Sequence, residues 1–277
     1  MRGRENRFLL LMVAPAIVVG AAFFLLPLAR LAVVGATGKL GFSAYTAVVT
    51  NPQYFGALTS TIVLSVAVTV VTLVIAGIAG VFLERNRFFG REALISMLTL
   101  PLAFPGVVVG FMVIMLAGRT GLIGELTSYF GAGRLVFAYS IAGLFTGYIY
   151  FSIPRVILTI MAAAEKLDPA LEEAAKSLGA NPWRVIVDVI LPALKPALIA
   201  SGAICFATSM GAFGTAFTLA TDIKVLPIVI YTEFTLLANI SLAAALSIVL
   251  GIITWATLAL SRVAAGATAA AARSEER

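Results

Sequence analysis

The sequence predicts an all-α membrane protein with six transmembrane helices and one pair of short cytoplasmic helices. The chain has 277 residues, of which 61% are hydrophobic and only 12% are charged, and its mean hydropathy is +1.07. Soluble domains carry about 25% charged residues, so this composition is typical of a chain that spans a bilayer. Long apolar runs alternate with short loops, and one long polar segment, 162–196, interrupts them.

Six apolar runs are long enough to cross a bilayer core of about 30 Å as helices. The first could also begin a signal peptide, but such peptides have apolar cores of about 7–15 residues, so we interpret it as a retained helix. We expect one transmembrane domain, 1–277, that contains all six. The predicted helices cover residues 8–29, 57–83, 93–117, 135–161, 197–220 and 240–261.

Prolines, glycines and polar residues predict where these helices deform or end. Pro101 and Pro105 predict a kink or break in the third helix, and Pro154 with Arg155 predicts an interruption of the fourth. The expected connections are a polar loop at 30–56, a glycine-rich loop with room for a short interfacial helix at 118–134, a loop with a re-entrant or interfacial piece near 228–231, and a disordered alanine-rich tail from 262.

Lysine and arginine residues are distributed unequally between alternate loops. Thirteen lie in 1–7, 84–92, 162–196 and 262–277, whereas five lie in the loops of the opposite side. Cytoplasmic loops are enriched in these residues, so both termini and the polar segment are expected in the cytoplasm. Membrane orientation therefore explains the net charge of +6 better than nucleic-acid binding does.

The polar segment contains the signals of two short amphipathic helices. Asp168 can cap a helix that starts at Pro169, and Gly179 suits the left-handed conformation that ends it. A second helix restarts at Asn181-Pro182, and Pro192 and Pro196 are expected to stop it. Apolar residues follow the helical spacing in both: Leu171, Ala174, Ala175 and Leu178, then Trp183, Ile186, Val187 and Ile190. The pattern predicts a docking hairpin in which two short helices, starting at Pro169 and Pro182, meet at a turn at Gly179. We call this turn, together with the two short helices, the elbow.

The source of energy is constrained by which residues are absent from the sequence. Five of the six predicted spans contain no Asp, Glu, Lys, Arg or His, whereas secondary transporters use such residues to bind a coupling ion. The chain has no histidine, one cysteine (Cys205) and no glycine-lysine phosphate loop, so we expect no catalytic residue, cofactor, metal site or ATPase activity. A secondary transporter, a channel and an intramembrane hydrolase remain as weaker alternatives.

The polar segment resembles the EAA loop of ABC importer permeases. The motif residues are Glu173-Ala174-Ala175, then Gly179 after three residues, then Leu191-Pro192 and Pro196. The family usually has isoleucine two residues before Leu-Pro, where this chain has Val189. The resemblance implies that segment 162–196 forms coupling helices that dock in a cleft of a separate ATPase subunit. The alternative is an ordinary amphipathic surface hairpin.

The resemblance also implies a set of partners and functional residues. The partners are two cytoplasmic ABC ATPase subunits, a second permease subunit that is identical or paralogous, an extracytoplasmic solute-binding protein and the lipid of a bacterial inner membrane. Coupling to the ATPase is assigned to Glu173, Ala174, Ala175, Leu178, Gly179, Trp183, Leu191 and Pro192. A pathway or gate is assigned to Met210, Phe213, Tyr148 and Tyr150, although helix packing and an interfacial aromatic belt explain these residues equally well.

The solute is the least determined feature of the sequence. The overall pattern resembles permeases for polyamines, and sulfate, ferric iron and phosphonate permeases share much of it. A polyamine would favour carboxylates along its route, and Asp222 and Glu233 are the acidic residues near the outer loop before the last helix. We therefore expect a polyamine-like solute, with the other three solutes as alternatives.

Overall fold

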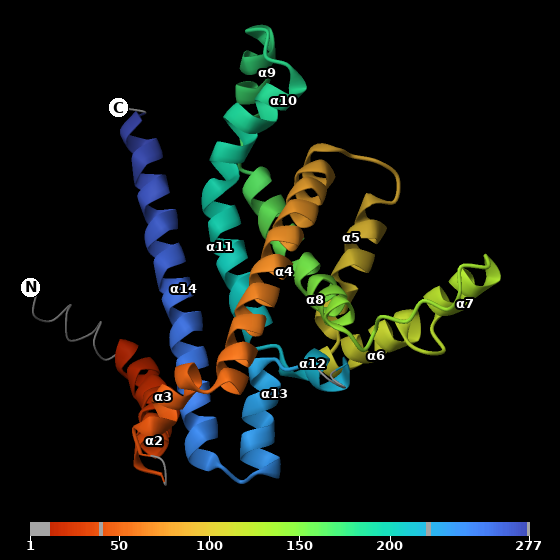
Figure 1. Ribbon diagram of the computed structural model, residues 1–277. Coiled ribbons are helices and arrows are strands. Elements are labelled where there is room, and N and C mark those ends of the chain that lie inside the picture. Colours follow the sequence, from red (N-terminus) through yellow and green to blue (C-terminus); the bar gives the residue numbers. More distant parts are fainter. Residues whose placement is uncertain (1–11, 39–40, 220–222, 276–277) are drawn as a thin grey trace, which may run out of the picture. The chain divides into compact units, whose positions relative to one another are not determined.

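The computed structural model describes residues 12–38, 41–219 and 223–275, with side chains as far as residue 266. Every regular element in these ranges is a helix (Figure 1). Six helices are long and apolar enough to span a membrane: Met12–Thr37, Pro52–Arg85, Gly106–Tyr129, Ile141–Ala164, Pro182–Met210 and Ile240–Gly266. The predicted fold class, an all-α membrane protein with six spans, is confirmed.

The elements follow one another with few residues between them. Up to the fourth span they are η1 (a π-helix, Ala21–Leu25), α2 (Leu26–Thr37), α3 (Ser43–Thr50), α4 (Pro52–Arg85), α5 (Arg91–Thr99), η2 (a 3₁₀-helix, Leu100–Ala103), α6 (Gly106–Ala117), α7 (Leu122–Tyr129) and α8 (Ile141–Ala164). The remainder are α9 (Pro169–Ser177), α10 (Pro182–Val185), η3 (a π-helix, Ile186–Ile190), α11 (Leu191–Met210), α12 (Phe213–Leu219), α13 (Leu226–Tyr231), η4 (a π-helix, Thr232–Leu236) and α14 (Ile240–Glu275).

The chain divides into two compact units. Unit 1 comprises Met1–Leu58 and Val229–Ile252, and unit 2 comprises Thr59–Ile228 and Ile253–Arg277. In unit 1 the Tyr45 hydroxyl donates a 2.8 Å hydrogen bond to the Ala32 carbonyl, which fastens α3 to α2. The single transmembrane domain expected over residues 1–277 stays a prediction.

The core of unit 2 is built where α6, α8 and α12 approach closely. Leu144, Ile160 and Leu219 are fully buried in it. A Cβ atom added at Gly110 would lie 2.6 Å from Thr218 Cβ, and one added at Gly147 would lie 2.9 Å from Thr215 Cγ2. Small residues permit this close approach, and the van der Waals packing that results stabilises the contact. Such packing is needed because lipid provides no hydrophobic driving force between helices.

The prolines within the spans have two different outcomes. Pro101 and Pro105 do break the third predicted helix, because α5 ends at Thr99 and α6 begins at Gly106. The predicted interruption at Pro154 is wrong, since α8 continues through it from Ile141 to Ala164. Neighbouring helices and local adjustments satisfy the freed carbonyl groups in a membrane, so proline is tolerated there.

The prediction that Pro192 and Pro196 stop the second short helix is also wrong. The helical path runs without a break from Pro182 to Met210, with Pro196 inside α11. The π-helical turn η3 lies directly before Pro192, and the Leu191 N–H donates to the Ile186 carbonyl five residues earlier. The wider turn accommodates a proline whose missing N–H would otherwise leave an α-helical bond unmade.

Segments expected to be loops or disordered contain helices. The segment 30–56 holds the end of α2, all of α3 and the start of α4, and the loop before the last span holds η4 as well as α13, a short helix at the place of the piece expected near 228–231. The alanine-rich tail, for which the sequence predicts disorder, continues α14 to Glu275. Alanine has the highest helix propensity, which explains why α14 extends beyond the predicted end at 261. The glycine-rich segment 118–134 contains the short helix α7, at the place where the sequence leaves room for one.

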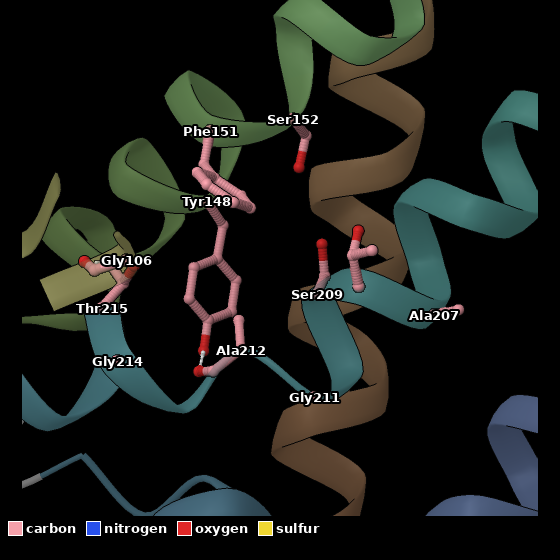
Figure 2. A pocket seen from close by; sticks show the side chains of 11 residues that line it. Gly106, Tyr148, Phe151, Ser152, Ala207, Ser209, Gly211, Ala212, Gly214 and Thr215 are labelled. Carbon is pink, nitrogen blue, oxygen red and sulfur yellow. Dashed lines mark hydrogen bonds between the residues drawn. The ribbon is translucent and has the colours of Figure 1, made fainter. Parts of the chain in front are cut away.

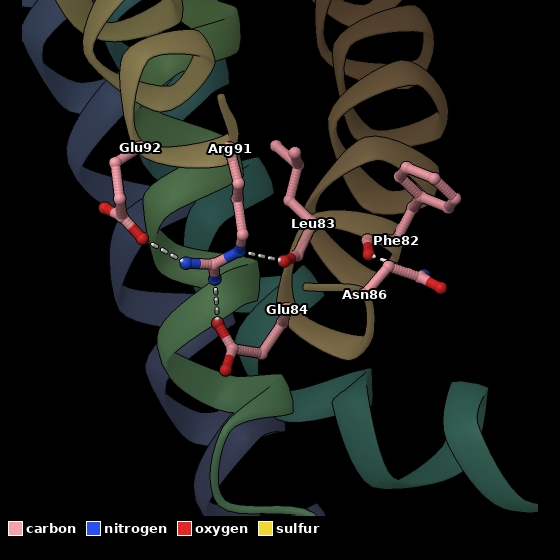
Figure 3. A network of polar contacts seen from close by, with 6 residues as sticks. All are labelled: Phe82, Leu83, Glu84, Asn86, Arg91 and Glu92. Carbon is pink, nitrogen blue, oxygen red and sulfur yellow. Dashed lines mark hydrogen bonds and ion pairs between the residues drawn. The ribbon is translucent and has the colours of Figure 1, made fainter. Parts of the chain in front are cut away.

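A buried arginine fixes the turn between α4 and α5 (Figure 3). Arg91, which is only 7% exposed, donates from Nε to the Leu83 carbonyl at 2.6 Å. Its guanidinium also pairs with Glu84 at 3.1 Å and with Glu92 at 2.6 Å. The last turn of α4 is therefore tied to the first residue of α5 by a charge that is almost fully paired.

Candidate functional site

The first helix of the polar segment has well-defined ends. Asp168 Oδ1 accepts the Ala170 N–H at 2.9 Å, which confirms the predicted N-cap, and Pro169 is the first helical residue. Gly179 has φ +85°, the left-handed conformation that the sequence predicts. The Gly179 and Ala180 N–H groups donate to the carbonyls of Lys176 and Ala175 at 2.9 and 3.0 Å. These two bonds form a Schellman motif, which turns the chain sharply after α9.

The second helix begins directly after that turn. Asn181 Oδ1 accepts the Arg184 N–H at 2.8 Å, and Pro182 occupies the first helical position. From there α10, η3 and α11 continue as one helical path into the fifth span. A displacement of the turn at Gly179 is therefore connected directly to a membrane helix.

The elbow exposes apolar side chains on its outer surface. Leu178 is 89% exposed and Trp183 is 71% exposed, whereas Ala175 and Ala180 are half-buried against the core of unit 2. The side chain of Glu173 is exposed as well. Of the other motif residues, Ala174, Leu191 and Pro192 are exposed too. The elbow thus presents a small apolar surface beside a carboxylate.

An ion pair that sequence reasoning missed joins the elbow to α4. Arg85 Nη2 lies 2.6 Å from Glu172 Oε1, and both side chains are mostly buried. The two atoms are close enough for a hydrogen bond but are not aligned for one. Glu172 Oε1 therefore has no hydrogen-bond partner in the described structure, and neither has Arg85 Nε. The sequence contains only a weak signal for it, namely two adjacent glutamates of which one must face the protein.

A cavity of about 390 Å³ lies within unit 2, beside the break between α11 and α12 (Figure 2). Its lining includes Gly106 at the start of α6, Tyr148 and Ser152 on α8, Ser209 on α11 and Thr215 on α12. The hydroxyl groups of Ser152 and Ser209 point into it in Figure 2. All the lining side chains are uncharged, so the cavity offers hydrogen bonds without a fixed charge.

Hydrogen bonds fasten most of the polar groups of this cavity. The Tyr148 hydroxyl donates to the Ala212 carbonyl at 2.6 Å, and the Thr215 hydroxyl donates to the Gly106 carbonyl at 2.9 Å. Ser209 Oγ is buried and has no hydrogen-bond partner in the described structure. Hydrogen bonds therefore hold most of the cavity wall in place, and the buried Ser209 hydroxyl can still form a hydrogen bond with a bound molecule.

The predicted gate residues lie around this cavity but do not all line it. Tyr148 lines it, while Met210 is fully buried next to it. Phe213 packs on Phe217 with ring centroids 5.2 Å apart. Tyr150, which is 37% exposed, is not among the lining residues.

The two predicted outer carboxylates have different outcomes. Asp222 lies outside the described residues. Glu233 belongs to unit 1 and is only 4% exposed. Its carboxylate accepts hydrogen bonds from the Tyr54 hydroxyl at 2.8 Å and from the Asn239 amide at 3.2 Å. Glu233 is thus enclosed by its own unit rather than displayed on an outer surface.

Six helices that are long and apolar enough to span a membrane define the class as a multi-pass membrane protein. The family described as "Binding-protein-dependent transport system inner membrane component" matches residues 73–269. That match covers more than half of the chain, so the chain belongs to this family and is a permease of a binding-protein-dependent ABC importer.

Three relatives are named for particular solutes. The chain is 34% identical to the sulfate transport system permease protein CysT of Escherichia coli K12 over 72% of this chain and 70% of that protein. It is 36% identical to the molybdenum transport system permease protein ModB of the same organism over 67% and 81%. It is 30% identical to the putative 2-aminoethylphosphonate transport system permease protein PhnU of Salmonella typhimurium over 95% and 94%.

A solved structure has the same fold. A chain of a bacterial alginate ABC transporter, crystallised with an alginate-bound periplasmic protein, superposes with a TM-score of 0.78 over 93% of both chains at 19% identity. These relatives give no support to the expected polyamine specificity.

The hydrogen bond from Tyr148 predicts a stability difference between two tyrosines of α8. Tyr148→Phe removes this hydrogen bond from the partly buried Ala212 carbonyl, which should destabilise the protein by about 0.5–1.5 kcal/mol and lower its thermal unfolding midpoint in detergent. Tyr150→Phe alters a partly exposed side chain of the same helix and should leave the midpoint unchanged. Equal midpoints for the two variants would contradict the assigned role of Tyr148.

Proposed function

We propose that the chain is one of two permease subunits, identical or paralogous, that together form the translocation pathway of an ABC importer. Two cytoplasmic ATPase subunits hydrolyse the ATP, and an extracytoplasmic binding protein delivers the solute. The observation that carries this proposal is the elbow at Gly179, where Leu178 and Trp183 are exposed and the helix that follows runs directly into a membrane span. Exposed apolar residues grouped on one surface are typical of a site that binds a partner.

The residues of the elbow receive separate roles in this proposal. Leu178 and Trp183 enter the cleft of the ATPase, and Glu173 meets a basic group beside it. Gly179 sets the angle between the helices, and Ala175 keeps the side of the elbow that packs on the core of unit 2 small, while Ala174 belongs to the exposed docking surface. Leu191 and Pro192 connect the elbow to α11 through the π-helical turn.

We propose that the solute is a small tetrahedral oxyanion such as sulfate, molybdate or a phosphonate. The three relatives named above for such solutes support this choice. The cavity lining contains no carboxylate, which a polyamine would favour, and no cationic side chain either, so the choice of an oxyanion rests on the relatives. Phe213 and Met210 form the gate beside the cavity, and Tyr148 holds the backbone of the gate in place. A polyamine remains the alternative, for which Asp222 and Glu233 would be needed.

The test of this function uses the purified complex in proteoliposomes. The chain would be produced with the ATPase and binding protein encoded beside it, and uptake of labelled sulfate, molybdate, 2-aminoethylphosphonate and spermidine would be measured with and without ATP. We expect ATP-dependent uptake of one oxyanion that requires the binding protein. Uptake without ATP would favour a carrier or channel, and uptake of spermidine would overturn the oxyanion proposal.

We propose that both termini and the elbow lie in the cytoplasm, as the distribution of lysine and arginine predicts. In a Cys205→Ser background, a cysteine at Ser128 on α7 should react with a membrane-impermeant thiol reagent in intact cells. A cysteine at Ser177 beside the elbow should react only after permeabilisation. Both serines are exposed, so access depends on the side of the membrane. The reverse labelling pattern would exclude this orientation and ATPase docking at the elbow.

Gly179→Val should uncouple the importer without unfolding it. Valine is disfavoured at φ +85°, by about 1–2 kcal/mol, so the turn between α9 and α10 should change shape. We expect the ATPase to detach or to lose its stimulation by the loaded binding protein, as measured by pull-down and ATP hydrolysis.

Gly131→Val is a matched control for that substitution. Gly131 has φ +74°, and an added Cβ would meet nothing within 4 Å, as at Gly179, but it lies in the segment between α7 and α8. This variant should assemble and hydrolyse ATP normally. If Gly179→Val also retains assembly, stimulated hydrolysis and uptake, the elbow is a passive hairpin.

A further inference from the structure

Two adjacent glutamates of α9 face different surroundings. The side chain of Glu173 is exposed, whereas Glu172 is mostly buried, with its carboxylate 2.6 Å from the Arg85 guanidinium. Arg85 is the last residue of α4, and it also lies 3.4 Å from the Leu167 carbonyl just before α9. Within the described chain, this is the recorded ion pair that joins the elbow to another element.

We propose that the Arg85–Glu172 pair transmits the movement of the coupling elbow to α4, while Glu173 serves docking of the ATPase. Both are positioning residues, since neither needs to touch ATP or solute. The proposal rests on the function proposed above and adds a division of labour between the two glutamates.

The end of α4 that receives this contact is firmly held on its other side. Arg91 at the start of α5 binds the Leu83 carbonyl and the Glu84 carboxylate, the two residues directly before Arg85 (Figure 3). A force on Arg85 is therefore applied to a helix end that is already tied to α5. Rigid elements joined by paired charges can carry such a displacement, whereas a frayed helix end would absorb it.

The element beyond Arg91 reaches the cavity. Helix α5 is followed by the 3₁₀-helix η2 and then by Pro105, and the next residue, Gly106 at the start of α6, lines the cavity and accepts a hydrogen bond from the Thr215 hydroxyl. The ion pair thus stands at one end of a continuous set of contacts within unit 2 that leads from the elbow to the cavity wall. A second route runs from the elbow through α10 and η3 to α11, whose Ser209 also lines the cavity.

The Arg85–Glu172 pair forms fewer hydrogen bonds than its two groups allow. Arg85 Nε is buried without a hydrogen-bond partner, and the closest contact of the guanidinium is poorly aligned. An arginine and a carboxylate can form two parallel hydrogen bonds, so a small shift of α9 would improve the contact. The recorded arrangement is the weaker one in this proposal, and the stronger, two-bond arrangement would form when the elbow moves.

The experiment compares Glu172→Gln, Arg85→Met and the exchange Arg85→Glu/Glu172→Arg in the assembled importer. The probe is the solute that the wild-type complex takes up, and the readouts are retention of the ATPase, thermal unfolding midpoint, hydrolysis stimulated by the loaded binding protein, and solute imported per ATP. Arg87→Met is the matched control, because Arg87 is an exposed arginine two residues beyond Arg85. Glu173→Gln is compared as the docking variant.

We expect each single variant of the pair to keep its ATPase, while the stimulation of ATP hydrolysis by the loaded binding protein and the solute imported per ATP fall about fivefold or more, the lower end of typical coupling between sites. A modest fall in the unfolding midpoint accompanies the loss of one partner of this mostly buried pair. The exchanged pair should recover most of this loss, Arg87→Met should match wild type, and Glu173→Gln should instead lose ATPase retention.

Three results would overturn the proposal. One is normal coupling in Glu172→Gln and Arg85→Met, and another is a loss of coupling that the exchanged pair does not recover. The third is a fall in unfolding midpoint and assembly that parallels the lost activity, which would make the pair purely structural. If the wild-type complex itself shows no stimulation by a binding protein, the proposed function fails rather than this inference.

Discussion

The polar groups of the backbone have no water to bind in the interior of a bilayer, and most of this architecture follows from that requirement. Every regular element of the described chain is helical. Pro154 and Pro196 lie inside helices rather than at their ends. The π-helical turn before Pro192 has the same origin, because it lets the chain pass a missing N–H while the helix continues.

Charged groups are expensive in the same environment, so they gather where the helices end. Arg91 is buried, yet it binds one carbonyl and two carboxylates in the turn after α4. Arg85, at the last position of α4, meets Glu172 of the elbow. A need for charge pairing at helix ends therefore creates the polar contacts that connect the elbow to the spans, which makes these contacts available for coupling.

Glycine supplies both the close packing of unit 2 and the shape of the elbow, for two different physical reasons. Gly110 and Gly147 are required because no Cβ atom fits between the helices that meet there. Gly179 is required because its φ of +85° closes the Schellman motif at the end of α9, where space is ample. The cavity depends on the first property, since α6, α8 and α12 converge around it, and ATPase docking as proposed depends on the second.

The sequence by itself determined the fold class, the number of spans, and the caps and turn of the elbow. Composition and run length require membrane helices, and the caps at Asp168 and Asn181 and the turn at Gly179 act within a few residues of the chain. Only the tertiary structure decided that Glu172 rather than Glu173 faces the protein, that Pro154 leaves α8 unbroken, and that Ser209 and Ser152 share a cavity. The reason is physical range: capping and turns depend on neighbouring residues, whereas ion pairs and cavities depend on helices that lie far apart in the sequence and meet only after packing.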